Sequence, residues 1–148
     1  MRYIPKFDPN YNPAYIALNE FYKTSTHTIK VAVERENGLI YVKEIPVNDD
    51  LNESYFYVER IVKSILWLVG GYKVYVSDKD IYELLNKDYS ATGIRAFDYH
   101  FVSKVYEKPF ELVYTSIEDF PKELTQNVKC GGHTNGCRIG FDAGGSDR

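Results

Sequence analysis

Polar and apolar residues alternate along residues 28–47, which is the clearest periodic pattern in this chain. Apolar side chains occupy alternate positions from Ile29 to Val33 and resume from Ile40, as is typical of strands that bury one face. Asn37-Gly38 divides the pattern and favours a type I′ turn, because both central residues of that turn need positive φ. We therefore predict a β-hairpin. Its predicted pairs are Val33 with Val42 and Glu34 with Tyr41.

A helical period replaces this alternation between Asn52 and Val69. Apolar residues recur every three or four positions and charged residues fall between them, as in a helix that packs against a core. Gly70-Gly71 follows, and glycine commonly ends a helix because it adopts positive φ without strain. A helix is therefore predicted over residues 52–69. Its apolar positions are Tyr55, Val58, Ile61, Val62, Ile65, Leu66 and Val69.

A short strand and a second helix are predicted next. Tyr72–Val76 is a brief apolar run, which suits a short strand. Ser77, with Asp80 three residues further on, is the expected N-cap of a helix that ends near Lys87.

The last part of the pattern predicts two more strands, over Arg95–Tyr106 and Pro109–Thr115. Ile117–Thr125 fits either a short helix or a loop. The whole order is a β-hairpin, a helix, a strand, a helix and two further strands. This order predicts a mixed α/β (α+β) fold, in which helices pack on a mixed sheet.

The chain divides into four segments at this level. Residues 1–26 contain three prolines and are predicted to form an extended N-terminal arm, with room for a short helix from Pro13 to Tyr22. Residues 27–125 would form an α/β accessory domain. Residues 126–137 lose the hydrophobic period, as a linker does, and residues 138–148 would begin another domain.

Composition excludes several classes of protein. A length of 148 residues with 44% hydrophobic content suits one ordinary domain. The net charge of −3, with both signs interspersed, gives no basic stripe, so no nucleic acid is expected as a partner. The chain lacks a run of about 18 apolar residues and a signal-peptide core, so we expect no membrane partner and a cytoplasmic location. Its fourteen tyrosines would mark a partner surface if exposed and a core if buried.

The final residues carry a candidate phosphate-binding loop, Asp142-Ala143-Gly144-Gly145-Ser146, which follows a short apolar strand. Glycine amides and a hydroxyl can approach phosphate oxygens closely, and a carboxylate can hold magnesium through water. The run 138–146 resembles the first phosphate-binding motif of the actin, hexokinase and Hsp70-like ATPases. Within that superfamily it is most similar to sugar kinases and relatives of the ROK (repressor, open reading frame, kinase) family. Phe56–Arg60 and Phe97–Phe101 also resemble an N-terminal region found on some bacterial ROK proteins.

This resemblance implies ATP and magnesium as cofactors of an intact parent protein. Asp142 would position the magnesium, and Gly144, Gly145 and Ser146 would contact phosphates of ATP. Phosphoryl transfer needs groups from several segments, so one loop does not make a kinase. We therefore expect an N-terminal accessory or assembly domain, cut within the ATP-binding motif and without catalytic residues of its own. Its expected partner is the missing ATPase domain of the same protein, or a second copy in a homodimer.

Alternative functions stay open. The domain could form part of the substrate cleft of an ATP-dependent sugar kinase, with Arg95, Asp98 and His100 as the first candidates. Asp98 and His100 would share one face of the predicted strand, although a structural strand with one hydrogen-bonded histidine is the simpler interpretation. Glu59-Arg60 is predicted to lie on a solvated helix face. The order of elements also loosely resembles the β-β-β-α-β-α-β order of one actin-like half, with only two leading strands evident.

A small-ligand or metal-binding module is the remaining alternative. Cys130, His133 and Cys137 could supply three zinc ligands, and His27 or His100 would have to complete the four that a structural site needs. We predict a linker with reduced thiols here and no metal site.

Overall fold

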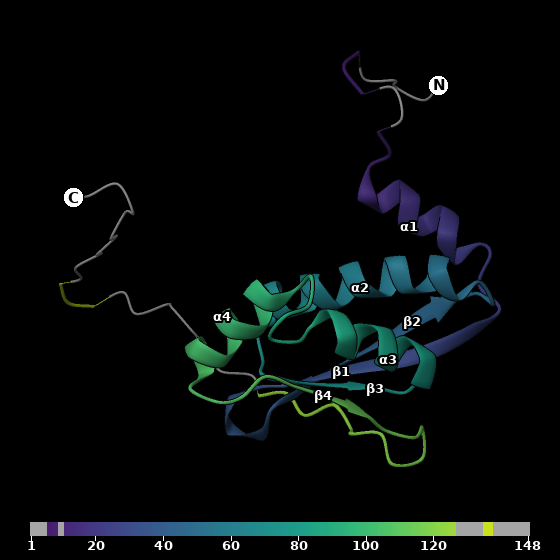
Figure 1. Ribbon diagram of the computed structural model, residues 1–148. Coiled ribbons are helices and arrows are strands. Elements are labelled where there is room, and N and C mark those ends of the chain that lie inside the picture. The colour runs from purple at the N-terminus through teal and green to yellow at the C-terminus, as the bar shows by residue number, and fades with distance from the viewer. Residues whose placement is uncertain (1–5, 9–10, 127–134, 138–148) are drawn as a thin grey trace.

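The computed structural model describes residues 6–8, 11–126 and 135–137, and it contains a four-stranded sheet with the strand order β2-β1-β3-β4. The first strand is antiparallel to two neighbours, and the last pair is parallel. Helices cover one face of this sheet (Figure 1). The predicted mixed α/β fold is therefore confirmed. The strands are β1 (His27–Glu34), β2 (Ile40–Val47), β3 (Lys73–Val76) and β4 (Glu111–Tyr114).

Helices α2, α3 and α4 lie over the same face of the sheet, and α1 stands above α2 (Figure 1). The short helix for which the N-terminal arm has room is therefore present as α1. Two strands precede α2 in the described part of the chain, whereas the actin-like order has three leading strands. The helices are α1 (Ala14–Tyr22), α2 (Leu51–Leu68), α3 (Lys79–Asp88) and α4 (Ala96–Tyr106), and a 3-10 turn η1 spans Glu36–Gly38.

The hydrophobic core lies between the sheet and the helices. Alternate residues of the two central strands point into it, as the period of the sequence predicts. Each fully buried aliphatic side chain stabilises the fold by about 1.5–3 kcal/mol. The side chains with 0% exposure include Val31, Val33, Ile45, Val58, Val62, Val74, Val76 and Leu85.

Local sequence sets both ends of α2. The Asp50 carboxylate accepts hydrogen bonds from the backbone N–H groups of Asn52 and Glu53, at 2.9 and 3.0 Å, and so caps the first turn. After the helix, Gly71 has a φ of 137°, and a Cβ there would lie 2.1 Å from Val33 Cγ1. Only glycine allows the chain to pass this close to β1. The predicted helix and its glycine stop are both confirmed.

The hairpin is present, but its predicted register is wrong by one residue. Val33 pairs with Tyr41, and Glu34 pairs with Ile40. Asn37 and Gly38 have positive φ, as expected, but the connection runs over residues 35–39 and includes η1. This longer loop replaces the two-residue type I′ turn and shifts the pairing.

Two other predictions about local structure are wrong. Asp78, not Ser77, caps α3: its carboxylate accepts from the backbone N–H of Ile81 at 2.9 Å, while Ser77 Oγ accepts from the N–H of Lys30. The segment predicted as a strand over residues 95–106 is mostly α4. Asp98 and Val102 are buried one helical turn apart, so the operative period is four residues and not two.

The outer face of the sheet, opposite the helices, is crossed by a loop. Residues 115–126 follow β4 and reach β2, where Leu124 and Ile40 exchange two backbone hydrogen bonds of 2.9 Å. This loop lies on the side of the sheet away from the helices (Figure 1). It resolves the choice left open for residues 117–125, because the structure has no helix there.

Candidate functional site

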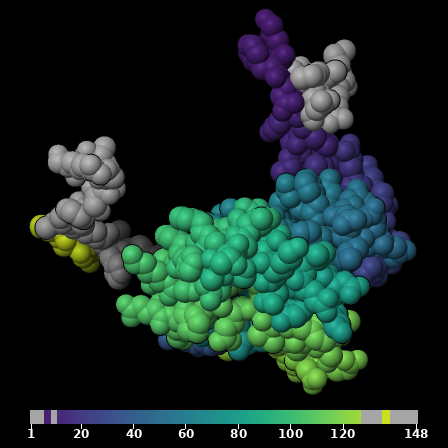
Figure 2. Space-filling view, in the orientation of Figure 1, coloured from purple at the N-terminus to yellow at the C-terminus, as the bar shows by residue number. Residues whose placement is uncertain are grey.

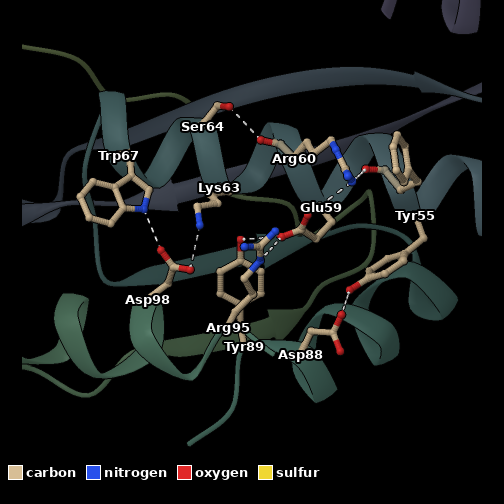
Figure 3. A network of polar contacts seen from close by, with 11 residues as sticks. Tyr55, Glu59, Arg60, Lys63, Ser64, Trp67, Asp88, Tyr89, Arg95 and Asp98 are labelled. Atoms are coloured by element: carbon tan, nitrogen blue, oxygen red, sulfur yellow. Dashed lines mark hydrogen bonds and ion pairs between the residues drawn. The ribbon is translucent and has the colours of Figure 1, made fainter. Parts of the chain in front are cut away.

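A buried carboxylate joins α2 to α4. Asp98, in the first turn of α4, is 3% exposed. Its carboxylate accepts a hydrogen bond of 2.7 Å from Trp67 Nε1 and one of 3.4 Å from Lys63 Nζ. Figure 3 shows both α2 side chains pointing toward this carboxylate. Asp98 therefore fixes the orientation of the indole ring of Trp67.

A second buried carboxylate, Glu59, occupies the middle of α2 and is 4% exposed. Arg95 Nε donates to it at 2.5 Å, and the Tyr89 hydroxyl lies 3.4 Å away (Figure 3). The hydrogen bond with Glu59 raises the pKa of Arg95, and burial raises the pKa of Tyr89. These groups satisfy one another, as buried charges must, so the layer is structural.

An aromatic ridge covers this polar layer on the outside of the molecule. We use the name for Trp67, Phe97 and Phe101, whose side chains come from α2 and α4. Trp67 is nearly parallel to Phe101, with centroids 5.2 Å apart and planes at 10°, and to Phe97 at 6.4 Å and 3°. The exposed fractions are 50% for Trp67, 68% for Phe97 and 42% for Phe101. Large apolar rings that stay exposed in this way are typical of interaction sites.

A hollow of about 240 Å³ adjoins the ridge between α2 and α4. Trp67, Leu68, Phe101 and Val105 contribute to its walls. Leu68 is itself 85% exposed. The ridge and the hollow together offer raised rings beside a depression, which is a shape that can receive an apolar anchor from a partner.

A larger groove of about 680 Å³ lies on the other side of α2, between this helix, α1 and the first half of β2. At one end of α1, Phe21 is buried and stacks on Tyr57 of α2, with centroids 4.3 Å apart. The N-terminal end of α1 stands away from the rest of the molecule (Figures 1 and 2). The helix α1 therefore forms one wall of the groove, which is closed at the Phe21 end of the helix and open at the other end.

The structure gives each of the residues proposed for a substrate cleft a different partner. Arg95 pairs with Glu59, Asp98 holds Trp67, and His100 is exposed on α4 with its ring 3.3 Å from the Ala91 carbonyl oxygen. The prediction that Asp98 and His100 share a face is wrong, since positions two apart on a helix point to different sides. The prediction of a solvated Glu59 is also wrong, whereas Arg60 is exposed.

The predicted phosphate-loop residues Asp142, Gly144, Gly145 and Ser146 lie outside the described residues, as do Cys130 and His133. Cys137 is described and exposed. His27 is on β1, 3.8 Å from the Asp49 carboxylate, and is far along the chain from the cysteines. Within the described ranges, no group of three or more side chains could hold a metal ion.

The aromatic ridge was missed from sequence, although a signal for part of it exists. Phe97, Phe101 and Val105 recur every four residues, which is a helical spacing. Reading this segment as a strand placed Phe97 and Phe101 beside Tyr99, which packs toward the core instead. No sequence signal shows that Trp67, 30 positions before Phe97, completes the ridge.

Comparisons with protein-family models, with curated proteins and with solved structures gave no match to this chain. In the part of the chain that the structure describes, no helix is both long enough and apolar enough to cross a membrane.

Proposed function

We propose that this chain is a non-catalytic accessory and assembly domain of a ROK-like sugar kinase, and that it binds its partner through the aromatic ridge. The observation that carries this proposal is the exposed, nearly parallel arrangement of Trp67, Phe97 and Phe101. Tryptophan is among the residues that dominate binding energy at protein interfaces. The polar groups nearby are already paired with one another, which supports binding rather than chemistry.

The ridge is ordered before any partner arrives. Asp98 holds the Trp67 indole through a hydrogen bond of 2.7 Å, and the two phenylalanines lie one turn apart on the same helix. Rings held in this way lose little conformational entropy on binding, which favours affinity. An apolar side chain of the partner would enter the hollow beside Leu68.

The partner that we favour is the ATPase domain that the resemblance of residues 138–146 implies. Independent protein interfaces use about 20–30 residues on each side. The ridge and its hollow are much smaller than that. A linker such as residues 126–137 would raise the effective concentration of an attached domain to about millimolar, so that a small surface suffices.

The same proposal assigns ATP and magnesium to the parent protein and places the protein in the cytoplasm. Asp142 would hold the magnesium, and Gly144, Gly145 and Ser146 would contact phosphate, together with segments that this chain does not supply. Calorimetric titration of the chain with Mg-ATP should give no heat of binding. Saturable binding that Asp142→Asn abolishes would show that this chain completes the nucleotide site by itself, which contradicts the proposal.

The single tryptophan allows a direct test of docking. Chain labelled with 5-fluorotryptophan has one fluorine resonance, from Trp67. This resonance is followed by NMR during titration with the separately produced ATPase domain of a ROK-like parent, up to the concentration of about 1 mM that a linker would supply. We expect a saturable shift at one-to-one stoichiometry. Phe97→Ser should abolish the shift, whereas Phe7→Ser, a matched change at a phenylalanine that is 95% exposed, should not.

Sedimentation velocity of the chain alone separates the two possible partners. We expect a monomer, and a resonance that does not move as the chain is concentrated. A dimer whose formation shifts the Trp67 resonance would show that the partner of the ridge is a second copy of the chain and not the ATPase domain. A resonance that moves with neither partner would refute the docking role of the ridge.

A further inference from the structure

We propose that the groove between α1, α2 and β2 binds a free long-chain carboxylate, with the acyl chain along α2 and the head group between Lys43 and Arg60. This inference is independent of the aromatic ridge and of any ATPase domain. The groove's volume of about 680 Å³ lies within the range of about 300–1,000 Å³ that is usual for small-ligand sites.

The walls of the groove are mainly apolar. Ile61, Ile65 and Leu68 line it from α2, and Ala14, Ala17 and Leu18 line it from α1. Along α2 the lining extends from Phe56 to Leu68, which corresponds to about 18 Å at the rise of an α-helix. Such walls suit a linear hydrocarbon chain. They would leave most hydroxyls of a sugar without hydrogen-bond partners, which is unfavourable in an apolar site.

The charge of the groove selects the head group. Lys43 and Arg60 are the charged side chains of its lining, and no aspartate or glutamate is among the described lining residues. Lys43 makes no ion pair within the described part of the chain, so its ammonium is free to bind an anion. An anionic head group therefore complements this groove and a cationic one does not.

Arg60 is already oriented for this role. Its guanidinium lies over the Phe56 ring, 3.4 Å from the centroid, and Nη1 donates to the Phe56 carbonyl oxygen at 3.0 Å. Its distance to the buried Glu59 carboxylate is 3.9 Å, and that carboxylate is held by Arg95 at 2.5 Å. Donors of Arg60 thus remain for a ligand carboxylate, which arginine binds through a planar fork.

The test is calorimetric titration of the full chain with sodium dodecanoate below its micelle concentration. We expect saturable binding at one site. Dodecyltrimethylammonium, which has the same chain and the opposite charge, should not bind. Decanoate should bind about tenfold more weakly, because each buried methylene contributes a factor of about three to four.

Variants locate the site. Lys43→Glu and Arg60→Glu should each weaken dodecanoate binding by about tenfold or more, whereas Lys79→Glu, a matched change at an exposed lysine on α3, should not. Ser64→Trp places a large ring in the groove without changing charge and should abolish binding. Circular dichroism shows whether each variant is folded, and Phe97→Ser should bind dodecanoate normally because Phe97 does not line the groove.

Three results would overturn the proposal. Equal binding of the anionic and cationic amphiphiles would show unspecific adsorption. Undiminished binding by folded Ser64→Trp would place the ligand elsewhere. Sedimentation with phosphatidylglycerol vesicles, without binding of free dodecanoate, would indicate a membrane surface instead of a free ligand.

Discussion

Charged side chains on the two sides of the sheet form similar pairs in very different surroundings. On the helix side, the side chains of Glu59 and Asp98 are 5% and 3% exposed, and their carboxylates are held by Arg95, Lys63 and Trp67. On the outer face, the side chains of Glu44 and Glu111 are 66% and 46% exposed and pair with Lys30 and Lys73. Distances alone do not separate the two groups, because the outer pair at Glu111 is 3.1 Å long.

The difference shows that burial, and not the ion pair itself, decides what each contact contributes. A buried charge that loses its partner remains in a medium of low polarity, which costs about 3–5 kcal/mol. An exposed charge that loses its partner is solvated by water, so the cost is about 0–1 kcal/mol. The inner pairs consequently fix how α4 packs on α2, and the outer pairs do not fix the sheet.

The largest effect is expected for Arg95→Met. This change leaves the Glu59 carboxylate buried, with the Tyr89 hydroxyl at 3.4 Å and the guanidinium of the exposed Arg60 at 3.9 Å as its remaining neighbours. We expect the free energy of unfolding to fall by about 3–5 kcal/mol in urea denaturation. The double variant Arg95→Met/Glu59→Gln should recover part of this loss, and a fall below about 1 kcal/mol would show that Glu59 does not need Arg95.

A smaller effect is expected for Asp98→Ala. The substitution removes the acceptor for Trp67 Nε1, and the expected loss is about 1–3 kcal/mol. Trp67 should also become less ordered, which fluorescence anisotropy of the single tryptophan reports directly. Glu83→Ala, at an exposed site on α3, serves as the control. Unchanged anisotropy in Asp98→Ala would contradict the role of Asp98 in positioning the indole.

For the outer face, a double-mutant cycle at Lys73 and Glu111 should give a coupling free energy of about 1 kcal/mol or less. The pair is 3.1 Å long, and its charges are partly solvated, so added salt should reduce the coupling further. A coupling that exceeds about 2 kcal/mol and resists salt would remove the contrast between the two sides of the sheet.

The smallest effect concerns pH and Glu34, also on the outer face. The hydrogen bond from the Tyr75 hydroxyl, with another from Tyr72, lowers the pKa of Glu34. A depressed pKa in the folded state stabilises the protein above the unfolded pKa of about 4.3, and this stabilisation is lost as the pH falls through the folded pKa. Glu34→Gln should therefore melt slightly below the parent at pH 7 and match it in strong acid. A constant difference across this range would contradict the assignment.

Local sequence patterns predicted much of the fold, because the hairpin and α2 follow the apolar period of their own residues. The alternation around Val31 and the helical period that Gly70 ends both act within a few residues, so the sequence shows them directly. The prediction for the α4 segment was wrong because its aromatic residues suit strands. The helical spacing of Phe97 and Phe101 competes with that preference, and burial of Asp98 and Val102 decides for the helix. Tertiary packing overrode local preference there.

The aromatic ridge and the polar layer beneath it were harder to predict, since each combines residues that are far apart in the sequence. Glu59 meets Arg95 across 36 positions, and Trp67 meets Asp98 across 31. Single residues of this kind give no periodic signal, whereas a glycine-rich loop such as Gly144-Gly145 is visible as a motif. The assignment of that loop to phosphate stays a prediction, because the loop lies outside the described residues.

The loop that crosses the outer face has a consequence for synthesis on the ribosome. Ile40 and Leu124 are 84 positions apart, so their pairing must wait until all of the intervening chain has been synthesised. Contacts between residues so far apart in sequence slow folding, because much chain entropy is lost before they form. Until Leu124 leaves the exit tunnel, the backbone groups of Ile40 at the free edge of β2 have no pairing partner. We expect this interval to be the one in which the growing chain most needs a chaperone.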